Sequence, residues 1–184
     1  MLMIIGARGW EHRHWDGTFY EKLLPPDWHL KFYSSNFDAA LAPASFWLKC
    51  NKEEIEEFLD DIPDDYPLIF EMPGNLESEL YLSVKDNIPN WVDFNEDVWS
   101  KTEDSYTLTQ ANIVSSNSLK DNCAVFKMSS KLRLKDVVLK EAMQTLKSEF
   151  KDYDTIYLFF DDTLIEVDII NTASVLLKML ALNA

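Results

Sequence analysis

The chain is poor in residues on which several classes of protein depend. Its 184 residues include four glycines and two cysteines. So few glycines argue against a β-sandwich with many tight hairpins, because the favoured hairpin turns need glycine. Cys50 and Cys123 lie far apart and follow no metal-ligand or redox spacing. We therefore expect two reduced thiols rather than a disulfide.

Basic residues are also scarce. Seventeen lysines and arginines, of which three are arginines, stand against 32 acidic residues, and the formal net charge is −15 at pH 7. Proteins that bind nucleic acid neutralise phosphates with lysine and arginine, so we expect no binding to DNA, RNA or anionic lipid. The acidity favours solubility instead.

Long apolar runs are missing too. No stretch approaches the roughly 20 apolar residues of a membrane span, and the apolar start of five residues is too short for a signal peptide. We expect a soluble cytoplasmic protein with no membrane association. A hydrophobic content of 47% excludes a disordered chain, and the length suits one domain over residues 1–184.

Apolar periodicity predicts strands that alternate with helices. Asn51 and Glu54 form a capping box that marks the start of the second helix. The expected strands are 1–5, 38–42, 67–72, 91–94, 106–114, 123–128 and 155–160, and the expected helices are 28–37, 51–62, 76–84, 134–150 and 167–180. This alternation favours a parallel α/β domain. The pattern alone leaves a barrel and an open doubly wound sheet undecided, although the length fits the open sheet better.

The segment GARGWEHRHWDGTFY, residues 6–20, concentrates glycine, tryptophan and histidine. Gly6 and Gly9 allow a tight turn after the first strand. We expect the aromatic residues that follow to fold the loop back, either over a barrel or against the start of the first helix. Their burial alone would stabilise the fold by several kcal/mol in area terms.

This opening resembles the signature of the domain of unknown function 72 family, also called YecE-like, in its Gly9-Trp10 pair and its Trp-x-Gly-x-Phe-Tyr motif at residues 15–20. Weaker similarity continues over most of the chain, through residues 24–47, 68–74, 91–99, 123–130 and 156–173. The resemblance implies a TIM-barrel-like fold. The family's strand and threonine-histidine motif between Trp47 and Pro67 are absent, which implies an α/β barrel trimmed by about one β/α unit.

In such a barrel the functional site lies at the carboxyl ends of the strands. Polar residues predicted there could bind a polar small molecule or a metal, or some of them could instead be ion pairs that close the barrel top. The candidate ligand-binding residues are Arg8, Glu71, Asp93, Asn95, Lys127, Asp161 and Asp162, with Trp10 and Trp15 in the adjoining loop. We expect no cofactor.

Several polar residues implied by the resemblance are replaced in this chain. Leu41 and Pro43 stand where the family has Glu and Asn, Asn95 replaces an arginine, Ser129 replaces a histidine, and Asp161-Asp162 replaces an Asn pair. Each change removes a group suited to acid–base chemistry, anion binding or hydrogen bonding. We therefore expect a degenerate barrel that binds a small ligand or acts as an interaction protein.

The alternative is a metal-dependent hydrolase that uses His12, His14, Glu71 and Asp161. A His-x-His pair after the first strand is a metal-ligand pattern, but it needs further imidazoles, and His29 is the single remaining histidine. The competing interpretation is two partly exposed loop histidines. The sequence carries no Gly-x-Ser-x-Gly motif and no phosphate loop.

The segment 51–65 carries eight acidic residues against one lysine. Such a charge run usually marks a solvated face. The alternative is that this acidic helix, 51–65, forms a surface for a protein partner.

Overall fold

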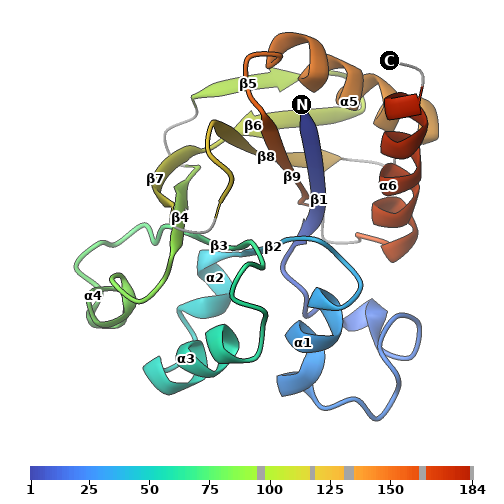
Figure 1. The fold of residues 1–184 in the computed structure, drawn as a ribbon. Coiled ribbons are helices and arrows are strands. Elements are labelled where there is room, and N and C mark those ends of the chain that lie inside the picture. Colours follow the sequence, from blue (N-terminus) through green and yellow to red (C-terminus); the bar gives the residue numbers. More distant parts are fainter. Residues whose placement is uncertain (95–97, 117–118, 131–134, 162–164, 183–184) are drawn as a thin grey trace.

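The computed structural model describes residues 1–94, 98–116, 119–130, 135–161 and 165–182, which form a mixed α/β fold built on a curled sheet (Figure 1). The strands are β1 Leu2–Arg8, β2 Ala40–Ala42, β3 Leu68–Glu71, β4 Asn90–Asp93, β5 Trp99–Thr102, β6 Tyr106–Gln110, β7 Asn112–Ser116, β8 Cys123–Ser130 and β9 Thr155–Phe160. The helices are α1 His29–Ser34, α2 Ala44–Trp47, α3 Lys52–Asp60, α4 Glu79–Val84, α5 Asp136–Glu149 and α6 Val167–Leu182, with 3-10 turns η1 Arg13–Trp15 and η2 Pro26–Trp28.

Within the described residues the sheet has nine strands in the order β5-β6-β8-β9-β1-β2-β3-β4-β7. The central strands from β8 through to β4 all run parallel. Strands β6 and β7 are antiparallel to their neighbours β8 and β4. The expected α/β fold with a parallel sheet is confirmed for these central strands, and the flanking strands make the sheet mixed.

A single stretch of chain pairs with two distant parts of the sheet. Only Ala111 separates β6 from β7, and its N–H donates to the carbonyl of Val125 at 2.9 Å, so the ladder with β8 runs one residue beyond β6. The chain then pairs with β4, where Val92 lies opposite Ile113. The segment 106–116 thus connects β8 and β4, which have four strands between them in the sheet, and this requires the sheet to curl.

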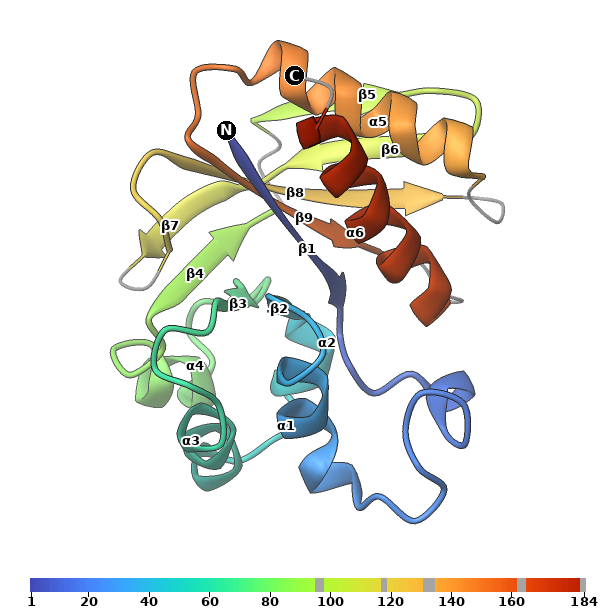
Figure 2. The same ribbon diagram turned by 45° about the vertical axis from the view of Figure 1, so that its right-hand side comes forward.

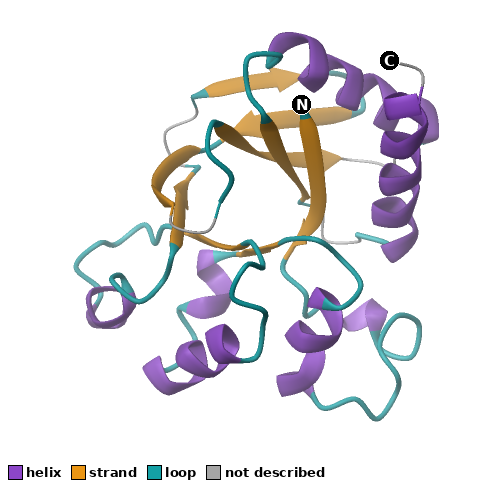
Figure 3. Ribbon diagram, viewed as in Figure 1, coloured by secondary structure: helices purple, strands orange, loops and turns teal. Residues whose placement is uncertain are grey.

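Both faces of the sheet are covered, as expected for parallel strands. The outer face packs against helices, and Figures 2 and 3 show α5 and α6 beside β8, β9 and β1, with α1 to α3 beside β2 and β3. The inner face holds a separate buried cluster that is drawn from every central strand except β1, whose Ile4 is partly buried and packs against it. This inner cluster comprises Ala39, Leu41, Ile69, Val92, Ala111, Leu119, Val125, Tyr157 and Phe159.

Gly6 is required where two strands meet inside the curl. A Cβ at this position would lie 2.1 Å from the carbonyl oxygen of Ala39 and 3.0 Å from the ring of Phe159. Backbone on one side and a buried ring on the other leave no room for a side chain. The glycine therefore lets Phe159 fill the interior beside β1.

Local signals predicted most elements correctly. The capping box of α3 is confirmed, because the Asn51 side chain accepts from the Glu54 N–H and the Glu54 carboxylate accepts from the Asn51 N–H. Strand β5 and the four-residue helix α2 were not predicted. Both cysteines are free thiols. Among the described helices, none has the length and apolar character needed to cross a bilayer.

Candidate functional site

Four charged side chains meet at the carboxyl end of the central strands. Arg8 ends β1, Glu71 ends β3, Lys127 lies in β8, and Asp161 directly follows β9. Side chains alternate between the faces of a strand, so these residues share the face of Ile4, Ile69, Val125 and Phe159, all in or against the inner cluster. We call Arg8, Glu71, Lys127 and Asp161 the charged cluster.

Arg8 is the centre of the charged cluster. Its Nε and Nη2 donate to the two carboxylate oxygens of Glu71 at 2.6 and 2.7 Å, and its Nη1 donates to Asp161 at 3.3 Å. The planar guanidinium matches the fork of a carboxylate, so the pair with Glu71 has a defined geometry. Glu71 also accepts from the N–H of Ala44 at the start of α2, at 3.3 Å. Glu71 is thereby held from two sides.

Lys127 is held more loosely. Its Nζ lies 3.9 Å from Asp161 and 4.5 Å from the centre of the Phe94 ring. The first distance is at the outer limit of an ion pair, and a cation over a phenyl ring is a weak contact where solvent is near. Of the two cations in the charged cluster, the lysine has more freedom to contact a solute.

The ion pairs determine what chemistry the cluster can perform. The hydrogen bond to Glu71 raises the pKa of Arg8, burial opposes this, and the charges of Glu71 and Asp161 raise the pKa further. Arg8 is therefore a permanent cation. Glu71 already accepts three hydrogen bonds, two from Arg8 and one from Ala44, so it is poorly placed to act as a base. The arrangement suits binding and orientation of a charged group better than proton transfer.

Of the remaining predicted site residues, the structure describes Asp93, Trp10 and Trp15, and none of these three lies on the inner face. Asp93 shares the outer face of Trp91, because the inner face of β4 belongs to Val92. Asn95 and Asp162 lie outside the described residues. Trp10 and Trp15 are only 2% and 1% exposed, so they form part of the core instead of offering open rings to a ligand.

Trp15 is the centre of an aromatic cluster against α1. Its ring stacks on Tyr33 with 6.0 Å between centroids and 5° between planes, and Phe19 and Tyr20 pack on its edges. Its Nε1 donates to the carbonyl of Ile165 at 2.7 Å. Of the two packings expected for the loop, the contact with the first helix is the one observed. The signature tryptophan thus joins the first loop to the chain that precedes α6.

Trp10 belongs to the same loop but packs elsewhere. Its ring makes edge contacts with Phe46 of α2 and Phe58 of α3, and its carbonyl accepts from the hydroxyl of Tyr20 at 2.6 Å. We call residues 10–20 the aromatic loop. Its burial is sufficient to explain why these residues are aromatic without invoking ligand stacking.

The two loop histidines contact the protein itself. Nε2 of His14 lies 2.6 Å from the carbonyl oxygen of Ile165, which can only accept, so this nitrogen carries the proton. Burial lowers the pKa of His12, as does the neighbouring His14, against a smaller opposite effect of the Gly9 and Arg8 backbone. His29 stacks on Tyr20 at 4.0 Å. Among the described residues, no three His, Cys, Asp or Glu side chains gather into a metal-binding group.

The sequence did not point to two contributors to the cluster. Phe94 contacts Lys127 and lies two residues after Val92, on the same inner face. The backbone N–H of Ala44 contacts Glu71. The alternation of side chains along a strand would have indicated Phe94, because Val92 and Phe94 are apolar and lie on either side of Asp93 in the sequence. The donor at Ala44 depends on the fold alone and leaves no signal in the sequence.

The acidic segment 51–65 lies along α3 and the turn after it. Ile55 is fully buried, while seven of the eight acidic residues are exposed. Some of them are paired within the chain, since Asp61 meets Lys31 at 3.3 Å and Glu56 meets Lys52 at 3.4 Å. The rest face solvent. Binding of a protein partner at this helix stays a prediction.

Comparison with known proteins agrees with this architecture. The family model "Protein of unknown function DUF72" matches residues 4–108, more than half of the chain, so the chain belongs to this family and the resemblance seen in the sequence is confirmed. The crystal structure of a DUF72 family protein from Thermotoga maritima is similar in fold, with a TM-score of 0.59, 11% sequence identity, and coverage of 98% of this chain and 100% of that one. No curated protein matches the chain.

Proposed function

We propose that this DUF72 protein binds a small polar molecule at the carboxyl ends of its parallel strands, through the charged cluster. The convergence of Arg8, Glu71, Lys127 and Asp161 from four strands onto one end of the sheet supports this proposal. Their side chains keep between 10% and 27% of their surface exposed, so a solute can reach them. A purely structural ion pair needs no such access.

The fold supports the same location. We propose that the curled sheet is a TIM-barrel-like fold trimmed by about one β/α unit, in which segment 106–116 completes the curl by pairing with both β4 and β8. In barrels of this kind, ligands bind at the carboxyl ends of the strands. The charged cluster occupies this position.

The charges of the cluster define the class of ligand. Two cations and two anions balance, so the cluster attracts neither a strong anion nor a strong cation by net charge. Lys127 can meet one anionic group, and the remaining acceptor capacity of Asp161 can meet hydroxyl or amine donors. A small hydroxy acid or amino acid carries both kinds of group.

The replaced residues favour binding over catalysis. Leu41 pairs in register with Arg8 and is fully buried in the inner cluster, so the position beside Arg8 is apolar. Ser129 follows Lys127 on the same face of β8 and carries a hydroxyl where the resemblance implies a histidine. Neither residue supplies a general acid or base. The metal-dependent hydrolase is the weaker proposal, because His14 bonds to Ile165 and no metal-binding group occurs among the described residues.

A thermal-shift screen tests the binding function. Amino acids, hydroxy acids and sugar acids are added to the wild-type chain and to two variants, Lys127→Met and the control Lys151→Met, whose exposed lysine lies away from the cluster. A ligand at a hundred times its Kd stabilises by about 2.7 kcal/mol, which raises Tm by roughly 5–11 °C in a chain of this length.

The two variants decide the outcome. We expect at least one compound to raise Tm for the wild type and for Lys151→Met, and to raise it much less for Lys127→Met. Binding that is equal in all three chains would place the ligand elsewhere. The absence of any shift across the three compound classes would reject this function.

A further inference from the structure

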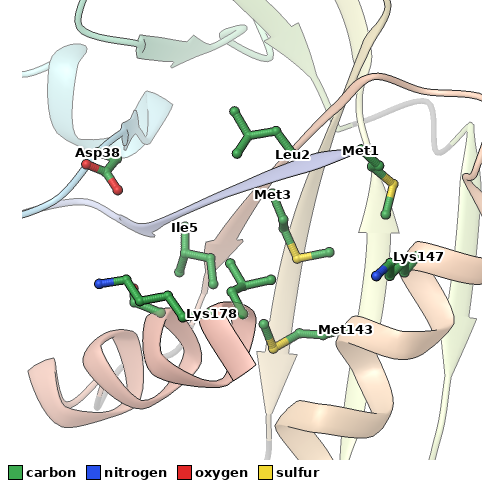
Figure 4. Close-up of a pocket in the computed structure, with 10 residues that line it drawn as sticks. Met1, Leu2, Met3, Ile5, Asp38, Met143, Lys147 and Lys178 are labelled. Atoms are coloured by element: carbon green, nitrogen blue, oxygen red, sulfur yellow. The ribbon is translucent and has the colours of Figure 1, made fainter. Parts of the chain in front are cut away.

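A pocket opens at the end of β1 that is opposite to the charged cluster, between the first half of that strand and helices α5 and α6 (Figure 4). Its volume is about 290 Å³. Its apolar lining consists of Met1, Leu2, Met3, Ile5, Met143 and Leu177. Sites for small molecules begin at roughly 300 Å³, so this pocket suits one short apolar chain and is too small for a two-chain lipid.

The floor of the pocket is buried and its rim is open. Met3, Ile5 and Met143 are 9%, 4% and 1% exposed, whereas Met1 and Leu2 on the rim are 46% and 53% exposed. Figure 4 shows Met3 and Ile5 pointing from β1 toward the helices, where Met143 faces them. Methionine is unbranched and adapts to the shape of its neighbours, so this floor can accommodate a flexible linear chain.

Two lysines stand at the edge of this apolar surface. Lys147 of α5 and Lys178 of α6 both line the pocket and are exposed, and neither makes an ion pair with another described residue. The chain as a whole carries a net charge of −15, so two unpaired cations beside one apolar pocket run against the average of its surface. Their flexible stems can follow a ligand while their amines stay in water.

One acidic residue also lines the pocket and limits where an anion can bind. Asp38 is exposed, and Figure 4 shows it on the side of the pocket opposite to Lys147. An anionic group is repelled from the Asp38 side and attracted to the Lys147 side. In the same view the amine of Lys178 lies on the Asp38 side, so Lys147 forms the cationic edge of the pocket beside its apolar floor.

We infer that this pocket binds an amphiphile with a single apolar chain and one anionic head group, of which a medium-chain fatty acid is the simplest case. The chain lies over Met3, Ile5 and Met143, and the carboxylate lies beside Lys147. The site is independent of the function proposed for the charged cluster, because the two lie at opposite ends of β1.

Methionine methyl NMR tests this inference directly. The chain has six methionines, and Met3 and Met143 line the floor of the pocket whereas Met72 and Met128 do not. The protein is labelled at its methionine methyl carbons and titrated with sodium decanoate below the concentration at which decanoate forms micelles. We expect saturable shifts of the Met3 and Met143 signals, assigned with Met→Leu variants, and unmoved signals from Met72 and Met128.

Charge is tested with a matched ligand and matched variants. Decanol has the same chain without the carboxylate and should bind more weakly than decanoate. The variant Lys147→Gln should weaken decanoate binding by up to about fivefold, because an exposed ion pair contributes about 0.2–1 kcal/mol, and it should leave decanol binding unchanged. Lys140→Gln on the same helix, whose lysine does not line the pocket, should bind decanoate as the wild type does.

Three results would overturn the inference. Equal shifts of all methionine signals would indicate non-specific association of decanoate with the surface. Equal decanoate affinity of Lys147→Gln and the wild type would exclude the cationic edge. If the protein sediments with phosphatidylglycerol vesicles and decanoate does not displace it from them, this face would bind a membrane surface instead of a single-chain ligand.

Discussion

The aromatic loop and the charged cluster begin within two residues of each other, yet the structure uses them in different ways. Trp15 is 1% exposed and bonds through Nε1 to Ile165. The side chain of Arg8 is 27% exposed and bonds to two carboxylates. The loop is therefore committed to packing, while the cluster keeps surface available to a solute. A family signature can thus persist for stability beside residues that remain available for binding.

The largest expected effect is on the aromatic loop. Trp15→Ala removes a buried indole that contacts Tyr33, Phe19 and Tyr20. We expect the free energy of unfolding to fall by about 3–5 kcal/mol, as for other buried large-to-small changes. Urea denaturation measures the loss.

The control for that prediction is Trp28→Ala, which truncates a tryptophan that is 57% exposed. We expect a change within about 0.5 kcal/mol there. If Trp15→Ala lost no more stability than this control, the loop would not be structural, and an aromatic ligand surface would become the better interpretation.

The second expected effect is a smaller loss of stability when the charged cluster is changed. Glu71→Ala removes the bidentate partner of Arg8 and leaves a half-buried guanidinium with Asp161 alone. We expect a loss of about 1–3 kcal/mol, between the values for surface and buried ion pairs. The measurement is again chemical denaturation.

A double variant separates the ion pair from simple packing. Arg8→Met/Glu71→Leu removes both charges and should recover most of the stability lost in Glu71→Ala, because the uncompensated cation is gone. A double variant no more stable than Glu71→Ala would mean that the ion pair itself stabilises this end of the sheet.

The two regions were also unequally predictable from sequence. Arg8, Glu71, Lys127 and Asp161 were all predicted at the strand ends, because a buried strand followed by a charge is a local pattern. Asp93 was predicted with them, but it lies on the other face of β4, and only the pairing of Val92 with Ile113 reveals this.

Non-local pairing could not be predicted. Residues 106–114 were expected as one strand, but they divide at Ala111 into β6, beside β8, and β7, beside β4. Neither partner is adjacent in the chain, so no periodicity within the segment distinguishes them. Likewise, the signature indicated that Trp15 is important, but nothing in the sequence named the carbonyl of Ile165 as its partner.

A third prediction concerns the residue that joins the two regions. Tyr33 stacks on Trp15, and its hydroxyl accepts from the N–H of Ala7 at 2.7 Å, one residue before Arg8. Tyr33→Phe keeps the stacking and leaves the buried N–H without this acceptor. We expect a loss of about 1–2 kcal/mol, since an unsatisfied buried donor costs about that much. An unchanged denaturation midpoint would mean that Ala7 finds another acceptor.

The smallest effect is the pH dependence contributed by His12, which lies where the aromatic loop leaves β1. Burial, followed by the charge of His14, lowers the pKa of His12 in the folded chain below its unfolded value of about 6.5. The unfolded state therefore takes up the proton first, so the contribution of His12 to stability is complete above that value and is lost as the pH falls below it. We expect wild type to lose more stability than His12→Gln between pH 7.5 and pH 5.5, by no more than about 1 kcal/mol. Glu11 acts in the opposite direction, because burial raises the pKa of its carboxyl, and comparison of the two chains cancels its contribution. If the stability of the two chains changed in parallel with pH, His12 would take up its proton as readily in the folded chain as in the unfolded chain. The start of the loop would then be as accessible to water as the charged cluster.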